Sequence, residues 1–117
     1  MMEKYFARFS EMKGISPING VDIKSVHLDN LMMTWMEFTA GSELPEHSHP
    51  HEQITIVIEG IIELTVAGTS RVLEKGGVAV VPSGVMHSAR IIEGPAVAID
   101  GWNPVREDYI MPGKGAS

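Results

Sequence analysis

The sequence contains no cysteine among its 117 residues. Disulfide bonds and thiolate chemistry are therefore excluded, and any bound metal ion must be held by nitrogen and oxygen ligands. Positive charge is also scarce, because 9 Lys and Arg residues stand against 15 Asp and Glu residues, for a net charge of −6. This balance disfavours nucleic acids and anionic membranes as partners. An anionic substrate would need a local positive site to draw it in.

Long apolar runs are absent as well. No stretch approaches the ~20 apolar residues of a membrane-spanning helix, and the first 14 residues lack the apolar segment of a signal peptide. We therefore expect a cytoplasmic protein with no membrane partner. A hydrophobic content of 44% and a charged content of 21% are those of an ordinary globular domain.

What the chain does contain is a series of short apolar segments rich in β-branched residues, with no convincing helical periodicity. We expect strands at residues 21–28, 31–38, 53–59, 61–66, 71–73, 78–81, 86–92 and 96–100, loops at 14–20 and 40–46, and turns at Gly60 and 93–95. This pattern is typical of an all-β antiparallel sandwich or small barrel. We expect a single domain over residues 1–117, with its core at about 21–110 and a disordered tail at 113–117.

The predicted strand at residues 31–38 has two apolar faces. Met32, Thr34, Met36 and Phe38 share one face, and Trp35 lies on the other. Residues 54–58 are β-branched at every position, so this strand also has two apolar faces. Only one face of each strand can line a barrel, so we expect a second copy to cover the other in a homodimer.

The densest functional signal begins with two histidines. His47 and His49 are two residues apart, so an extended chain sends both imidazoles to the same side. Gln53 has the same parity, and His87 follows a tight turn after the strand at 78–81. Three imidazoles and an amide oxygen would bind one divalent first-row metal ion (Ni, Zn, Mn or Fe) and leave one or two positions open. The alternatives are a polar strand start without metal, or a Gln53 that only hydrogen-bonds to a ligand.

The spacing of these residues resembles a known family. Gly41-x5-His47-x-His49-x3-Gln53-x6-Gly60 resembles the first cupin motif, and Gly76-x5-Pro82-x-Gly84-x2-His87 resembles the second. The resemblance implies a cupin-type antiparallel β-barrel, or jelly roll, that binds a metal. Gln53 departs from the motif, which has a metal-binding Glu there, and Ile91 replaces an Asn. Four neutral ligands would leave the ion its full +2 charge, which favours a carboxylate substrate.

A second feature is the last predicted strand. Asp100 shares a face with Ala96 and Ala98, and a carboxylate on an inner apolar face is costly unless it is paired or functional. Arg106 follows six residues later, beyond a proline, within reach of folding back towards Asp100. Two interpretations are open: a structural Asp–Arg pair at the barrel mouth, or a pair of functional groups.

The run from His47 to Ile54 and the ending Asp100-x3-Pro104-x-Arg106-Glu107-Asp108-Tyr109 resemble the KdgF group of pectin-degradation cupins. That group converts cyclic unsaturated uronates from pectin or alginate into open-chain keto acids, an isomerase-type reaction on a small anionic sugar acid. The resemblance implies metal ligands at His47, His49, Gln53 and His87, catalytic groups at Asp100 and Arg106, and substrate contacts from Arg106 and Trp102. Trp102 stands where the group has a Phe. Two other functions stay open: a metal-dependent dioxygenase and a non-catalytic module that binds sugar acids.

Overall fold

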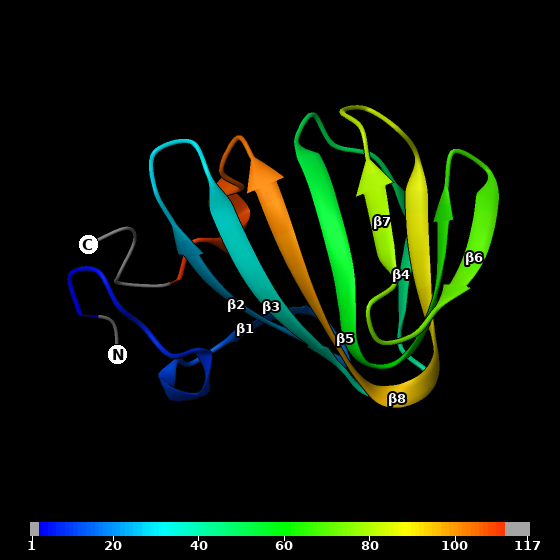
Figure 1. The fold of residues 1–117 in the computed structure, drawn as a ribbon, viewed down its shortest axis with the longest axis horizontal. Coiled ribbons are helices and arrows are strands. Elements are labelled where there is room, and N and C mark those ends of the chain that lie inside the picture. The colour runs from blue at the N-terminus through cyan, green and yellow to red at the C-terminus, as the bar shows by residue number, and fades with distance from the viewer. Residues whose placement is uncertain (1–2, 112–117) are drawn as a thin grey trace.

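Eight antiparallel strands dominate the computed structural model, which describes residues 3–111 (Figure 1). The strands are β1 (Ile15–Ile18), β2 (Val21–His27), β3 (Met32–Phe38), β4 (Glu43–His47), β5 (Glu52–Val66), β6 (Thr69–Leu73), β7 (Val78–Val81) and β8 (His87–Asn103), with 3-10 turns η1 (Phe9–Glu11) and η2 (Glu107–Tyr109). Their order is β1-β2-β3-β8-β5-β6, with β4 paired to β8 and β7 paired to β5. The jelly-roll type of fold predicted from the sequence is confirmed. The tail predicted at 113–117 lies outside the described residues.

The two long strands, β5 and β8, contribute to both walls of the barrel. The first half of β5 pairs with the second half of β8 and with β7, whereas the second half of β5 pairs with the first half of β8 and with β6. Both strands bend between these halves, as Figure 1 shows for β8. The turns predicted at Gly60 and 93–95 are therefore bends within continuous strands. At Gly60 φ is +80°, and a Cβ there would lie 2.7 Å from the Glu93 carbonyl oxygen, so only glycine fits.

Two short strands occupy segments that the sequence predicted to be loops. β1 lies within residues 14–20 and contains Pro17, and β4 begins within residues 40–46, contains Pro45 and ends at His47. Proline suggested a loop because it cannot donate a hydrogen bond to a strand ladder. It is tolerated here because, among the described residues, both strands are edges of the sheet: β1 pairs only with β2, and β4 pairs only with β8.

Side-chain alternation along the strands divides the inside of the barrel into layers. Phe38 opposite Ala96 lies nearest the bend and is apolar. The next row, Met36 opposite Ala98, is apolar too. A polar row follows it, in which Asp100 lies between Thr34 on β3 and Thr55 on β5, all three buried. The next row towards the open end pairs Met32 and Gln53 with Trp102 on β8. The faces predicted for residues 31–38 are confirmed, since Met32, Thr34, Met36 and Phe38 are buried and Met33 is 46% exposed.

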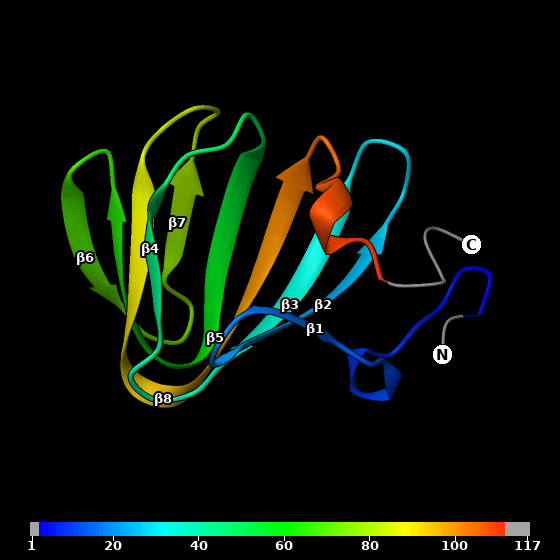
Figure 2. The ribbon, with the colours of Figure 1, turned by 180° about the vertical axis from the view of Figure 1, so that it is seen from behind.

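Helices contribute little to the described part of the chain. Within residues 3–111, no helix has the length and apolar character needed to cross a membrane. The turn η2 lies near β2, where the Ser25 hydroxyl donates to the Tyr109 carbonyl (Figure 2). This contact brings the segment that follows β8 back over the barrel, close to the open end.

Candidate metal centre and cavity

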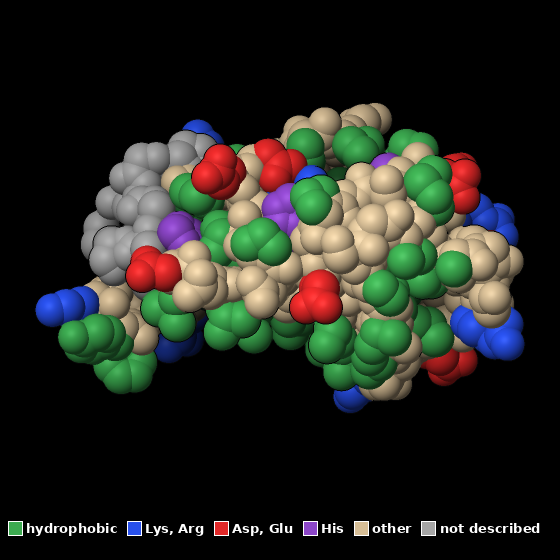
Figure 3. Space-filling model, turned by 90° about the horizontal axis from the view of Figure 1, so that it is seen from above, with side chains coloured by type: hydrophobic (Ala, Val, Ile, Leu, Met, Phe, Trp, Pro, Cys, Tyr) green, Lys and Arg blue, Asp and Glu red, His purple; other side chains and the backbone are tan. Residues whose placement is uncertain are grey.

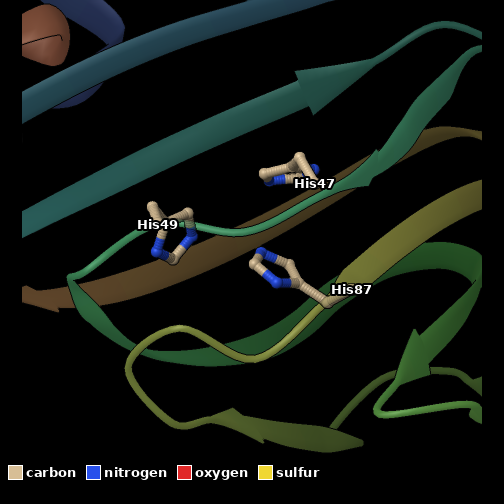
Figure 4. Close-up of side chains that lie close together, drawn as sticks. All are labelled: His47, His49 and His87. Atoms are coloured by element: carbon tan, nitrogen blue, oxygen red, sulfur yellow. The ribbon is translucent and has the colours of Figure 1, made fainter.

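Three histidines converge at the open end of the barrel (Figure 4). His47 ends β4, His49 lies in the loop that follows, and His87 begins β8 directly opposite His47. One ring nitrogen from each lies within 4.8 Å of the others. The structure brings these three predicted residues together, but not by alternation along one strand, because the strand ends at His47 and His49 is buried from the loop that follows. His51 lies outside this group.

The three imidazoles are held in the same tautomer. Each Nδ1 faces a backbone carbonyl oxygen two residues away: Pro45 for His47 at 2.7 Å, His51 for His49 at 3.0 Å, and Val85 for His87 at 2.8 Å. A carbonyl can only accept, so Nδ1 carries the proton and Nε2 presents a lone pair. Nε2 of His87 is buried without any hydrogen-bond partner. Such a set of oriented lone pairs is suited to bind a metal ion.

Gln53 extends this cluster. Its Oε1 lies 3.1 Å from Nε2 of His49, so two atoms with lone pairs face each other. A proton between them would require an imidazolium. Burial holds the pKa of His49 below its ordinary value, with the charges of His87 and Arg106 acting in the same direction. A shared cation would satisfy both atoms, since ligands bound to one ion at about 2.0–2.1 Å lie about 3 Å apart.

Asp100 is at the centre of a buried hydrogen-bond network. It is 1% exposed and accepts from Thr34 at 3.0 Å, from Thr55 at 2.5 Å and from Gln53 at 3.3 Å. The indole N–H of Trp102 donates in turn to the Thr34 hydroxyl at 3.0 Å. Burial raises the pKa of the Asp100 carboxyl, while the hydrogen bonds from Thr55, Thr34 and Gln53 act in the opposite direction.

Arg106 pairs with Asp108 and not with Asp100. Its Nη2 lies 2.8 Å and its Nε 3.2 Å from the two carboxylate oxygens of Asp108. Its guanidinium carbon also lies 3.9 Å from the ring centre of Tyr109 and 4.9 Å from that of Trp102. A direct Asp100–Arg106 ion pair is therefore absent, and only the charge of Arg106 acts on Asp100, where it lowers the carboxyl pKa. The two threonines already satisfy Asp100, and the Asp108 carboxylate, in the η2 turn, lies against the Arg106 guanidinium.

Two of the three histidines, His47 and His87, line one cavity of about 310 Å³. Gln53, Thr55, Asp100, Trp102, Arg106, Asp108 and Tyr109 also line it. A volume of this size suits a ligand as small as a monosaccharide. Seen from above, histidine side chains reach the surface at this end of the molecule, near both acidic and basic groups (Figure 3).

The sequence did not reveal the partners of the predicted site residues. Strand alternation places Thr55 on the same face as Gln53, and Thr34 on an inner face, but it does not show that both flank Asp100. That information lies in the cross-strand register, which joins residues 45 and 66 positions apart. Asp108 and Tyr109 belonged to the segment used for the resemblance, yet no spacing rule indicated that they enclose Arg106.

The comparison with protein families agrees with this geometry. A family model described as the cupin domain matches residues 34–101. The chain belongs to the cupin family. Within it, the chain is 32% identical over 83 residues to the pectin degradation protein KdgF of Dickeya dadantii, a match that covers 70% of this chain and 76% of that protein. This cupin is therefore KdgF-like, as the resemblance in the sequence implied.

Solved structures of other cupins support the same assignment. KdgF from Halomonas sp. superposes with a TM-score of 0.80 at 31% identity, covering 85% of this chain and 92% of that one. An RmlC-like cupin from Shewanella frigidimarina gives a TM-score of 0.86 at 28% identity, covering 92% and 97%. The family is broad, because Germin-like protein 1-4 of Oryza sativa is 38% identical over 89 residues, although the match spans only 36% of that protein.

Proposed function

We propose that this cupin is a metal-dependent enzyme that opens the ring of a cyclic 4,5-unsaturated uronate to give a linear keto acid. The observation that carries the proposal is the cavity, which combines a cluster of oriented histidines with Asp100 and Arg106 in a KdgF-like chain. The proposed activity is that of an isomerase on small sugar acids from pectin or alginate, and we expect the protein in the cytoplasm.

The reaction defines what the site must supply. The anomeric hydroxyl loses its proton, the bond between C1 and the ring oxygen breaks, and a carbonyl forms at C1. The electron pair of the broken bond leaves an enolate across C4 and C5, which becomes the 5-keto acid when C4 is protonated. The net change is an isomerisation, so neither an oxidant nor a reductant is required.

In this proposal His47, His49 and His87 hold a divalent ion, with Gln53 as the fourth ligand. When bound, the ion supplies positive charge for the substrate carboxylate or ring oxygen. Its charge is not reduced by any of the four ligands, because three imidazoles and one amide are neutral. The ion thus provides the local positive site that a chain of net charge −6 needs for an anionic substrate.

Asp100 is the group proposed to move the proton. It lines the cavity, and burial raises its pKa, which brings the carboxyl closer to the range useful for both accepting and releasing a proton. Arg106 is proposed to bind the substrate carboxylate with its fork of donors, two of which now face Asp108. Trp102 would cover the flat face of the sugar ring.

The test measures the absorbance of the C4–C5 double bond of an unsaturated monouronate. Metal-loaded protein is expected to accelerate its loss over the rate without protein, and metal-free protein is not. Binding of the uronate without faster loss of absorbance would instead identify a non-catalytic sugar-acid module. An oxygen electrode in the same cuvette addresses the dioxygenase alternative, because ring opening consumes no oxygen.

A further inference from the structure

The hydroxyl groups on either side of Asp100 have fixed directions. The Trp102 indole N–H can only donate, so the Thr34 oxygen accepts from it and sends its own proton to Asp100 Oδ2. On the other side Gln53 Nε2 can only donate, so the Thr55 oxygen accepts from it and sends its proton to Asp100 Oδ1. Both oxygens of the buried carboxylate therefore act as acceptors.

This arrangement also fixes the orientation of the Gln53 side-chain amide, that is, which way its oxygen and its nitrogen point. Turning the amide over would place Oε1 about 3.3 Å from Asp100 Oδ1, where two acceptors would repel, and would leave Thr55 without its donor. With Nε2 directed at Asp100 and Thr55, Oε1 must point the other way. It does so at 3.1 Å from Nε2 of His49, within the histidine cluster.

We propose that Asp100 is a positioning residue that requires an amide at position 53 and thereby aims the amide oxygen at the three histidines. A carboxylate at position 53 would lose the donated hydrogen bond and would bring two like charges together in a buried site. The pairing accounts for the departure from the Glu of the cupin motif at Gln53. It concerns the protein without substrate, so it holds whichever reaction the cavity performs.

The pairing predicts that exchanging the two groups restores the network. In the double variant Gln53→Glu, Asp100→Asn, the new amide at position 100 donates to Thr55, and the Thr55 hydroxyl reverses to donate to the new carboxylate. Thr34 still donates to the remaining oxygen at position 100, so no buried group loses its partner. In the single variant Asp100→Asn, by contrast, the new amide at position 100 faces the amide of Gln53, and one buried hydrogen-bond donor has no acceptor.

The experiment is a double-mutant cycle on the melting temperature of metal-free protein. Gln53→Glu alone is expected to lower the melting temperature by about 5 °C or more. Adding Asp100→Asn to it should recover at least half of that loss, whereas Asp100→Asn in the wild-type background should give no stabilisation. The double variant should also bind Zn²⁺, added alone in a competition titration, within about tenfold of the wild-type affinity.

A matched control uses Glu52→Gln in place of Gln53→Glu, because Glu52 is the exposed neighbour of Gln53. Its effect on the melting temperature should add to that of Asp100→Asn. If Asp100→Asn has the same effect in the wild type as in the Gln53→Glu variant, the proposal is overturned. Failure of the double variant to fold would overturn it too, since the restored network requires a folded protein. If only Gln53→Glu fails to fold, recovery of folded protein in the double variant supports the pairing.

Discussion

The two polar parts of the cavity wall, the histidine cluster and the surroundings of Asp100, are built in different ways. Each ligating imidazole is oriented by a backbone carbonyl two residues away in the sequence. Asp100 is held by side chains 45, 47 and 66 residues away, on two other strands. A locally oriented group depends on its own loop, whereas a group oriented over long range depends on the register of the whole sheet.

The largest effect is expected in the histidine cluster, whose side chains are oriented locally. The double variant His47→Ala, His49→Ala should bind no metal, because a single imidazole and an amide cannot replace a site built for four ligands. Metal content per folded chain, measured by elemental analysis after dialysis, checks this. His27→Ala is the matched control, since His27 lies outside the cluster. Full occupancy in the double variant would mean that the cluster is not the metal site.

The next largest effect is expected at Asp100, which is oriented by residues distant in the sequence. We expect Asp100→Asn to bind metal but to lose turnover of an unsaturated uronate by about 10²–10⁴-fold, the usual size of general acid–base catalysis. The measurement is kcat at saturating substrate, with metal occupancy determined on the same sample. Turnover within a few-fold of wild type would show that Asp100 does not move the proton and only positions Gln53.

The same contrast explains what could be predicted from the sequence. The histidine spacing, the inward parity of Gln53 and the inner face of Asp100 are local properties. The structure brings the three histidines together and places Gln53 and Asp100 on a cavity with two of them, His47 and His87. The partners of Asp100 are not local, because strand order and register decide that Thr34 and Thr55 flank it. The supposed Asp100–Arg106 pair failed for the same reason: reach along the chain does not reveal which acceptor is already satisfied.

Strand boundaries were missed for a related reason. Gly60 and the Gly94–Pro95 step look like turns in the sequence, yet β5 and β8 continue through them because each strand bends to join both walls of the barrel. Proline in β1 and β4 suggested loops, and only the position of these strands in the sheet makes proline acceptable. Residue types indicate where a chain changes direction, but not whether pairing continues beyond the change.

Arg106 belongs to neither polar part of the cavity wall. It lies in the segment after β8 and forms no hydrogen bond with the histidine cluster or with the surroundings of Asp100. Arg106→Ala should chiefly raise KM for an anionic uronate, by about 10–100-fold, because hydrogen bonds to charged groups contribute about 1.5–3 kcal/mol. Steady-state kinetics with metal-saturated protein separate KM from kcat. A fall in kcat at unchanged KM would instead show that Arg106 acts on the transition state and not as an anchor.

A smaller effect is expected at Asp108. Its carboxylate occupies two donors of Arg106 but is exposed to solvent on its outer side, so a substrate carboxylate must compete with a weak, screened ion pair. Asp108→Asn should therefore lower KM by about 2–5-fold, in line with the 0.2–1 kcal/mol typical of exposed pairs. Glu107→Gln removes the same charge from the neighbouring, exposed position and should change KM less. A higher KM for Asp108→Asn would show that Asp108 holds Arg106 in place for the substrate.

The smallest effect on chemistry is expected on the outer face of the sheet, which we define by the cross-strand row Val26, Met33, Gly101, Ile54 and Val80. Met33, Ile54 and Val80 are 46%, 57% and 62% exposed, and an apolar groove of about 610 Å³ lies along this face. We predict that a second copy covers this face in a homodimer, because exposed apolar residues that line up across neighbouring strands are characteristic of an interface.

Light scattering at micromolar concentration should therefore give twice the mass of one chain, and Val80→Lys should give a monomer. Val72→Lys is the matched control, because Val72 is 56% exposed but lies on β6 in the other wall. The monomeric variant should keep its metal and its turnover within a few-fold, since both polar parts of the cavity wall come from one chain. A monomeric wild type would contradict the dimer. Loss of metal or turnover in monomeric Val80→Lys would show that the cavity depends on a neighbouring copy as well as on the register of its own sheet.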